Sequence, residues 1–152
     1  MRTTLVAVGK LRPSFREASD EYLTRIRRYS PFEEREIREA GRAPTPTARK
    51  REETARITAA LPPGATLVLL DRGGFGWTSE ELARKLDGWR GSGRAVALVI
   101  GGAFGLDPAG LGPVLTRWSL GPLTLAHELA RVVVLEQWYR AWTILRGEPY
   151  HK

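Results

Sequence analysis

The chain has 152 residues, 42% of them hydrophobic, and a formal net charge of +7 at pH 7. Because this length can bury one sizeable core but would make two small ones, we expect residues 1–152 to form a single domain. The absence of cysteine excludes disulfides, cysteine-ligated metals and cysteine nucleophiles. Arginine outnumbers lysine by 20 to 4, which suits forked contacts to the phosphates of a polyanion. Solvated helix faces would explain the excess as well, so charge alone leaves both interpretations open.

Targeting and membrane segments are not predicted. The apolar run at residues 3–8 is too short for a signal peptide, and no stretch approaches the ~18 apolar residues that cross a bilayer. A cytoplasmic location without a membrane partner is the simplest expectation.

The first half of the chain predicts two strands and two helices. In chain order they are a buried strand at 3–8 ending at Gly9, a helix opened by a capping box from Ser14 to Glu17 and stopped by Pro31, a charged edge strand at 32–39, a proline-rich loop at 40–47 and a helix at 48–61.

The second half alternates strands and helices more regularly. The predicted elements are a strand at 65–70, a glycine-rich loop at 71–77, a helix capped by Thr78 and Ser79, a strand at 95–100, a short helix after Asp107 and Pro108, a strand at 117–120 and a helix at 126–145. Strands that are apolar on both faces and alternate with helices indicate an α/β fold with a mostly parallel sheet, covered by helices on both sides.

In such a sheet, ligands bind outside the carboxyl ends of the strands. Three of these ends are predicted at Leu70-Asp71, Gly101-Gly102 and Leu120-Gly121. Either glycine turn alone is ordinary turn chemistry, but the recurrence at neighbouring strand ends favours a site where the main chain contacts a ligand.

Several common cofactor motifs are missing. The chain has no G-x-G-x-x-G, no G-x-x-x-x-G-K-[ST] and no G-x-S-x-G, and two histidines without cysteines predict no metal site. A cofactor held by backbone and apolar contacts is therefore expected. S-adenosylmethionine suits this description, with its adenine in an apolar slot such as Leu120, Leu123 and Leu125.

The last predicted helix is apolar around more than half of its circumference. A helix packed on one sheet face needs a narrower stripe, so the surplus suggests a second burial surface, most simply a symmetric dimer partner. The alternative is a helix enclosed entirely by its own domain.

Motifs along the whole chain resemble the ribosomal RNA large-subunit methyltransferase H family, of the SPOUT class of knotted methyltransferases. The most specific are Val99-Ile100-Gly101-Gly102 followed by Gly105-Leu106, then Trp118-Ser119-Leu120, His127-Glu128, Tyr139-Arg140-Ala141 and the tail Arg146-Gly147-Glu148-Pro149-Tyr150-His151.

The resemblance implies an α/β fold whose C-terminal segment is threaded into a deep trefoil knot, an exception to the general absence of knots. It also implies a homodimer with the active site at the subunit interface. The implied reaction is methyl transfer from S-adenosylmethionine to N3 of a pseudouridine in a stem-loop of 23S (large-subunit) ribosomal RNA, on assembled ribosomes.

By position, the family's cofactor contacts correspond to eight residues of this chain. They are Leu70, Gly101, Leu120, Gly121, Pro122, Leu123, Thr124 and Leu125. The last segment departs somewhat from the family pattern, because Ala126 stands where a proline is common and Gly121-Pro122 replaces more polar residues.

Methylation of a ring nitrogen requires its proton to leave and its lone pair to meet the methyl group in line. The candidates for the base and for orientation are His127, Tyr150 and His151, with Arg140 as a clamp for a phosphate or carbonyl. The family ends in the same Tyr-His pair, which supports a role for the tail. A helix-terminal His127 bonded to backbone and a disordered His151 are the alternatives.

Two other functions remain open from the residues alone. A non-catalytic ribosome-binding or RNA-binding α/β module would explain the charge but not the glycine-ended strands. A flavodoxin-like domain for a small phosphate ligand would need a phosphate-binding first loop, and Gly9-Lys10-Leu11-Arg12-Pro13 is a poor one.

Overall fold

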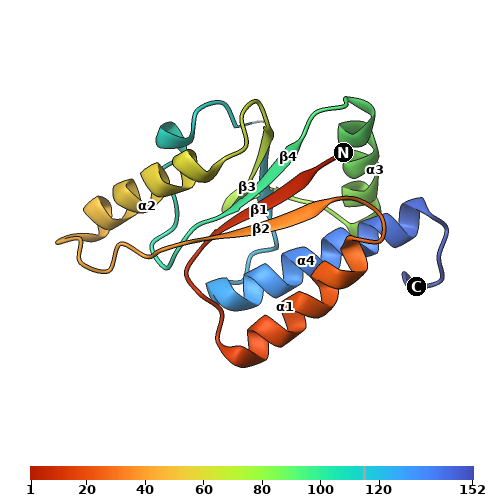
Figure 1. Ribbon diagram of the computed structural model, residues 1–152, viewed down its shortest axis with the longest axis horizontal. Helices are drawn as coiled ribbons and strands as arrows, with labels where there is room; N and C mark the ends of the chain where they lie inside the picture. Colours follow the sequence, from red (N-terminus) through yellow and green to blue (C-terminus); the bar gives the residue numbers. More distant parts are fainter. Residues whose placement is uncertain (115) are drawn as a thin grey trace.

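The computed structural model describes residues 1–114 and 116–152. Its centre is a five-stranded sheet with the strand order β2-β1-β4-β3-β5 (Figure 1). The strands are β1 (Thr3–Val8), β2 (Phe32–Ile37), β3 (Thr66–Gly76), β4 (Val96–Ile100) and β5 (Thr116–Ser119). The helices are α1 (Pro13–Ile26), α2 (Pro46–Ala60), α3 (Ser79–Gly91), a 3₁₀ helix (Pro108–Leu111) and α4 (His127–Leu145).

All strand pairs are parallel, and the sheet is covered on both faces, which confirms the predicted α/β class. Side chains alternate along each strand. In β1, Leu5 and Ala7 pack with α1, α3 and α4, whereas Val6 and Val8 pack with α2 and the 3₁₀ helix. Figure 1 shows α1 and α4 together on one side of the sheet and α2 on the other.

Local capping explains where several helices begin. Thr78 caps α3 and forms a capping box with Glu81, which confirms the predicted start. The Asp107 side chain accepts a hydrogen bond from the Ala109 N–H at the 3₁₀ helix. At α2, the Thr45 hydroxyl accepts from the Ala48 N–H, so this helix begins at Pro46, two residues before the predicted start.

The capping box predicted at Ser14 is wrong. Helix α1 begins at Pro13 with Arg12 as its N-cap. The Arg12 side chain makes no capping hydrogen bond to the first turn of the helix. Proline suits the first helical position because its fixed φ is already helical. The Arg12 N–H is bound instead by the Glu128 carboxylate at 2.7 Å, from the start of α4. The helix therefore gains its polar partner from a distant segment.

The loop predicted at residues 71–77 is also wrong, because β3 continues to Gly76. Its register with β5 shifts between Leu70 and Phe75, after which Phe75 pairs with Trp118 and Gly76 with Ser119. A Cβ on Gly74 would lie 2.5 Å from the Arg117 carbonyl oxygen. Glycine at position 74 thus allows the two strands to come close where the register shifts.

Helix α4 lies between α1 and α3 and against the sheet, and it buries Trp138 and Leu135 completely. Part of the wide apolar stripe is therefore used within this chain. Leu129, on the same helix, stays 40% exposed. In the described part of the chain, no helix is long and apolar enough to cross a membrane.

Candidate functional site

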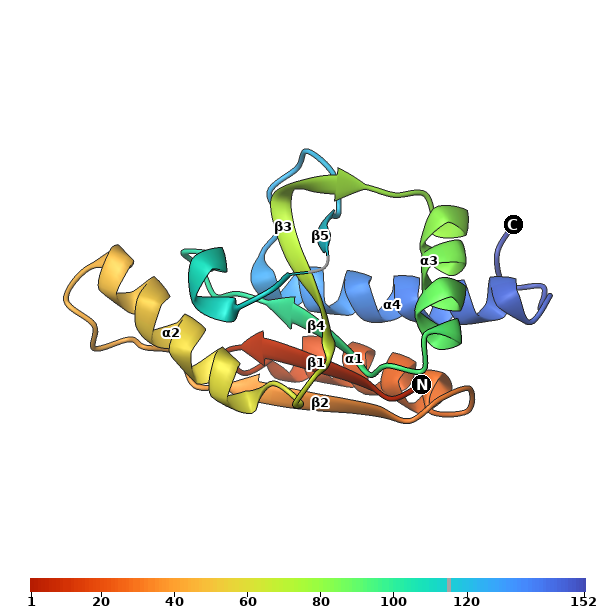
Figure 2. The ribbon, with the colours of Figure 1, turned by 90° about the horizontal axis from the view of Figure 1, so that it is seen from above.

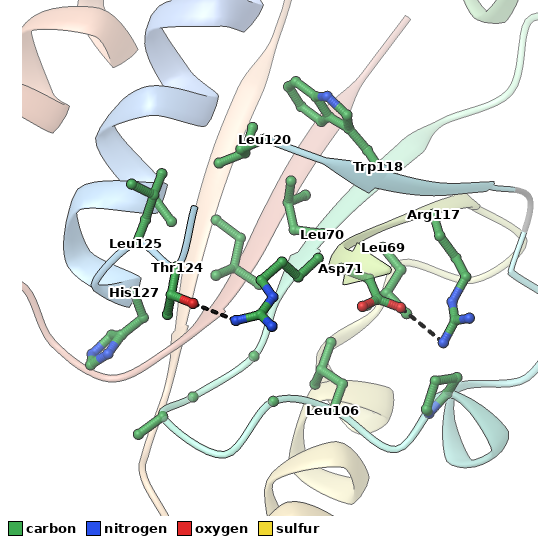
Figure 3. A pocket seen from close by; sticks show the side chains of 18 of the residues that line it. Leu69, Leu70, Asp71, Leu106, Arg117, Trp118, Leu120, Thr124, Leu125 and His127 are labelled. Atoms are coloured by element: carbon green, nitrogen blue, oxygen red, sulfur yellow. Dashed lines mark hydrogen bonds and ion pairs between the residues drawn. The ribbon is translucent and has the colours of Figure 1, made fainter. Parts of the chain in front are cut away.

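A cavity of about 470 Å³ opens at the carboxyl ends of β4 and β5 and beside the interior of β3, where its register with β5 shifts (Figure 3). These three strands are neighbours in the sheet, so residues from all three reach the same cavity. The segment that connects β5 to α4 closes one side of the cavity, and the turn after β4 closes another. We call it the cofactor cavity.

The cofactor cavity gathers seven of the eight residues predicted to contact a cofactor. They are Leu70, Gly101, Leu120, Gly121, Leu123, Thr124 and Leu125. Pro122 does not line it. The three leucines of the predicted apolar slot, Leu120, Leu123 and Leu125, all line the cavity, and Leu123 is the most exposed of them at 76%.

Glycine is required in the cavity wall at two adjacent positions. A Cβ on Gly101 would lie 2.7 Å from the Leu106 side chain and 3.0 Å from the Gly105 backbone. A Cβ on Gly102 would lie 2.6 Å from the buried Glu53 carboxylate. The turn after β4 is therefore tightly packed, and Gly101, Gly102, Gly105 and Leu106 all line the cavity.

The segment after β5 is held by short-range hydrogen bonds. The Ser119 hydroxyl accepts from the Gly121 N–H and donates to the Gly121 carbonyl, both at 3.1 Å. Gly121 has a φ of 121°, a conformation that L side chains rarely adopt. The Arg72 guanidinium donates to the Thr124 hydroxyl, which links this segment to β3 (Figure 3).

The rim of the cofactor cavity is mostly cationic. Lys50, Arg72 and Arg117 all line it, and among the described residues the one acidic side chain in its lining is Asp71, which pairs with Arg117 at 2.8 Å. These cations were not singled out from the sequence, because they come from separate elements and follow no spacing. Their common position becomes visible only once the strands are assembled.

His127 also lines the cofactor cavity, at the first position of α4. Among the described residues, its ring makes no hydrogen bond, so the alternative of a histidine tied to backbone is not what the structure shows. The neighbouring Glu128 anchors this end of the helix by binding the Arg12 backbone and guanidinium. The Arg12 N–H, and then its side chain, hold the pKa of Glu128 below its ordinary value.

The other predicted site residues meet at the opposite end of α4. The Arg140 guanidinium binds Glu136 at 2.5 Å and the His151 Nδ1 at 3.3 Å, and it lies 4.7 Å from the Tyr150 ring centre. The Tyr150 hydroxyl donates to Glu136 at 3.0 Å, and the His151 Nε2 lies 2.9 Å from a Glu80 oxygen. We call these five residues the tail cluster.

Ionisation in the tail cluster is set by its neighbours. Burial, reinforced by the Glu136 carboxylate, raises the pKa of Tyr150 well above its ordinary value. The hydrogen bond that Arg140 donates to the Glu136 carboxylate raises the pKa of Arg140, which stays charged. Both nitrogens of His151 are engaged, one by Arg140 and one by Glu80, so this ring is ordered rather than frayed.

Glu136 and Glu80 are the members of the tail cluster that the sequence did not reveal. Glu136 stands one helical turn before Arg140, a spacing that could have indicated the pair. Glu80 lies on α3, and no local pattern connects it with the last residues of the chain.

The structure separates the two groups of predicted residues. His127 and Arg140 are 13 positions apart on one continuous helix, which corresponds to about 20 Å at the helical rise per residue. Within one chain, the tail cluster therefore does not line the cofactor cavity. Over residues 1–114 and 116–152, no three potential metal ligands converge at either place.

Known proteins match this chain over nearly its whole length. The family model described as a predicted SPOUT methyltransferase matches residues 1–151. Proteins named ribosomal RNA large subunit methyltransferase H match from Rubrobacter xylanophilus (50% identity, 99% of this chain and 98% of the relative) and from Anaeromyxobacter sp. (47% identity, 100% of both). The protein of that name from Solidesulfovibrio magneticus is 50% identical over 97% of this chain and 96% of its own.

A solved structure supports the fold independently. It is that of a probable methylase family protein from Haemophilus influenzae, with a TM-score of 0.54 at 11% identity, and the match covers 99% of this chain and 70% of the other. At this identity the likeness concerns the fold alone. On the family model and the full-length relatives, the chain belongs to the SPOUT methyltransferases and, within them, to the ribosomal RNA large subunit methyltransferase H family.

Proposed function

We propose that residues 1–152 form one methyltransferase domain that transfers a methyl group from S-adenosylmethionine to N3 of a pseudouridine in a stem-loop of large-subunit ribosomal RNA. The family membership supports methylation of this RNA, and action on assembled ribosomes implies a cytoplasmic location. The observation that carries the proposal is the cofactor cavity, where seven of the predicted contact residues meet.

The cavity suits the adenosyl part of S-adenosylmethionine. Its volume lies within the range of about 300 to 1,000 Å³ usual for small-molecule sites, and its walls combine apolar side chains with glycine turns. Leu70, Leu120 and Leu125 would contact the adenine, and main-chain groups at Gly101 and Gly121 would bind the polar edges. When bound, the cofactor supplies an electrophilic methyl group on its sulfonium.

The base that accepts the proton from N3 is, in this proposal, His127. Its ring lines the cavity and makes no hydrogen bond among the described residues, so a nitrogen is available. Tyr150 keeps its proton because its pKa is raised, which makes it a hydrogen-bond donor rather than a base. Arg140 stays charged and can orient a phosphate or a carbonyl oxygen.

A homodimer would bring the two groups of residues together. The distance of about 20 Å along α4 is too long for the tail of one chain to reach its own cavity without unfolding. A two-fold axis that crosses α4 would set the tail of one subunit beside the cavity of the other. The exposed Leu129 side chain on this helix supports such an interface.

The trefoil knot is part of the same proposal, since the family fold carries it. A knotted chain must thread its C-terminal segment during folding, which makes refolding slow. Refolding from denaturant followed by tryptophan fluorescence tests this, and a single fast phase of milliseconds would argue against the knot.

The substrate is proposed to be the assembled ribosome rather than free RNA. One small basic domain makes few RNA contacts, so the surrounding ribosome would supply the placement. Methylation rates on ribosomes and on the isolated stem-loop compare the two, and equal rates would contradict this part.

The central experiment is mass spectrometry of ribosomal RNA after incubation of ribosomes with the protein and S-adenosylmethionine carrying a labelled methyl group. A labelled N3-methylpseudouridine in the large-subunit RNA is expected. If calorimetry detects no cofactor binding while the protein still binds ribosomes, the non-catalytic RNA-binding function takes its place.

A further inference from the structure

A second hollow, of about 630 Å³, lies between the end of β3 and the first turns of α3. We call it the β3–α3 hollow. It is lined by Phe75, Trp77, Glu81, Arg84, Lys85 and Thr116, together with the Gly76 backbone. Figure 2 shows β3 bending near its carboxyl end, close to β5, before the chain enters α3. None of these residues belongs to the cofactor cavity or to the tail cluster.

The β3–α3 hollow and the cofactor cavity share a wall of two stacked indoles. The Trp77 and Trp118 rings lie 5.5 Å apart between centres and are nearly parallel, at 13°. Trp118 lines the cofactor cavity, whereas Trp77 lines the β3–α3 hollow. A ligand in the hollow would therefore be separated from the cofactor cavity by these two rings.

Phe75 presents an aromatic ring to solvent at this place. Its side chain is 71% exposed, although its backbone is anchored by pairing with Trp118 in β5. The close approach of Gly74 to Arg117 holds the strand there. A rigidly mounted, exposed aromatic ring loses little conformational entropy when a flat ligand stacks on it.

The charge of the β3–α3 hollow favours an anionic ligand. Arg84 is exposed, and Lys85 lies 4.6 Å from the Trp77 ring centre. Within the described chain, neither cation forms an ion pair. The one acidic residue, Glu81, is engaged by the Thr78 N–H at 2.8 Å in the capping box of α3. Two free cations therefore face a ligand beside an exposed aromatic ring.

We infer that the β3–α3 hollow binds an unpaired nucleotide of the substrate RNA next to the target base, with its base stacked on Phe75 and its phosphate at Arg84 and Lys85. Stacking on aromatic rings combined with cationic side chains is how proteins bind single-stranded nucleic acid. A protein partner would not need the two cations. The inference rests on the proposed function for the nature of the substrate.

The test compares three variants with the wild type. Phe75→Ala removes the ring, Phe75→Tyr keeps it, and Arg84→Glu reverses a charge in the hollow. The matched control is Arg94→Glu, which makes the same charge change at an exposed position that precedes the amino end of the central strand β4, whereas the hollow lies at the carboxyl end of β3. Each protein is assayed for KM and kcat on ribosomes, cofactor affinity, oligomeric state and direct ribosome binding.

Phe75→Ala should raise the KM for ribosomes about tenfold, as expected for the loss of one base–aromatic stack, with kcat and cofactor affinity within twofold. Phe75→Tyr should restore the wild-type KM. Arg84→Glu should raise KM severalfold and make ribosome binding less dependent on salt. Arg94→Glu should have a smaller effect on KM and on the salt dependence.

An unchanged KM in Phe75→Ala overturns the inference, and so does a change in oligomeric state without a change in ribosome binding, which would make the hollow a protein interface. If the wild type binds ribosomes but does not methylate them, the proposed reaction fails. A tenfold loss of ribosome binding in Phe75→Ala would then still support the hollow as an RNA site.

Discussion

The two ends of α4 carry two sites of different construction. At its N-terminal end, the cofactor cavity is built from strand ends, glycine turns and leucine side chains. At its C-terminal end, the tail cluster is built from five polar or charged side chains that bind one another. One helix thus connects a site defined by backbone shape with a site defined by side-chain chemistry.

This difference predicts different sensitivities. A backbone-lined cavity tolerates changes of side-chain polarity but not added volume, because its walls are tightly packed. A network of charged hydrogen bonds tolerates small changes of volume but not the loss of a donor or a charge. The departures of Gly121-Pro122 and Ala126 from the family pattern fall in the first site, where such changes are tolerated.

Deleting residues 148–152 removes Tyr150 and His151 from the tail cluster and should have the largest effect. We expect methylation to be abolished while cofactor affinity stays within a few fold, because none of the deleted residues is among those that line the cofactor cavity. Methyl transfer to ribosomes and calorimetry with the cofactor measure the two effects. Full activity of the truncated protein would refute a role for the tail.

Gly101→Val acts on the other site. Its Cβ would clash with Leu106 and the Gly105 backbone, so this turn, which lines the cavity, must change shape. We expect cofactor binding to weaken roughly 100-fold. This factor corresponds to the upper end of the free-energy cost of overpacking a well-packed region. Gly88→Val, in open space on α3, is the matched control. Undiminished binding by Gly101→Val would count against the cavity as the cofactor site.

Mixing these two inactive proteins tests whether the sites combine across subunits. A mixed dimer would pair the intact cavity of the truncated subunit with the intact tail of the Gly101→Val subunit. If half of the dimers are mixed, and each mixed dimer has one complete site of two, activity should return to about a quarter of the wild-type value. No recovery after subunit exchange would indicate that each chain serves its own cavity.

Arg140→Lys is a smaller change within the tail cluster. Lysine keeps the charge but cannot contact Glu136 and His151 together with the planar fork of arginine. We expect kcat to fall about tenfold with little change in cofactor affinity, since one charge-assisted hydrogen bond is lost. Arg146→Lys, just after α4 and exposed, should leave kcat unchanged.

The contrast between the sites also explains what the sequence could predict. The parallel α/β sheet and the strand ends near Gly101 and Leu120 follow from hydrophobic periodicity and glycine positions, which are local signals, whereas the strand end predicted at Leu70 is wrong because β3 continues beside β5 to Gly76. The tail motif was visible, but its partner Glu80 was not, because it is far away in the sequence. Likewise, α1 takes its polar cap from Glu128, so the local capping box at Ser14 was a false signal.

The contact between Glu128 and Arg12 also predicts a pH effect on stability, the smallest that we expect. The folded-state pKa of Glu128 is lowered, so its stabilising contribution is present above the ordinary glutamate value of about 4.3 and is lost as the pH falls below it. Glu128→Gln should therefore have a Tm a few degrees lower at pH 7, and the difference should shrink toward pH 3.

Glu17→Gln is the control, since Glu17 is an exposed carboxylate on α1 that forms no ion pair within the described residues. A Tm difference for Glu128→Gln that stays constant from pH 7 to pH 3 would mean that lost packing, not lost charge, weakens this junction. Packing rather than an ion pair would then hold the N-terminal end of α4 in place beside the cavity.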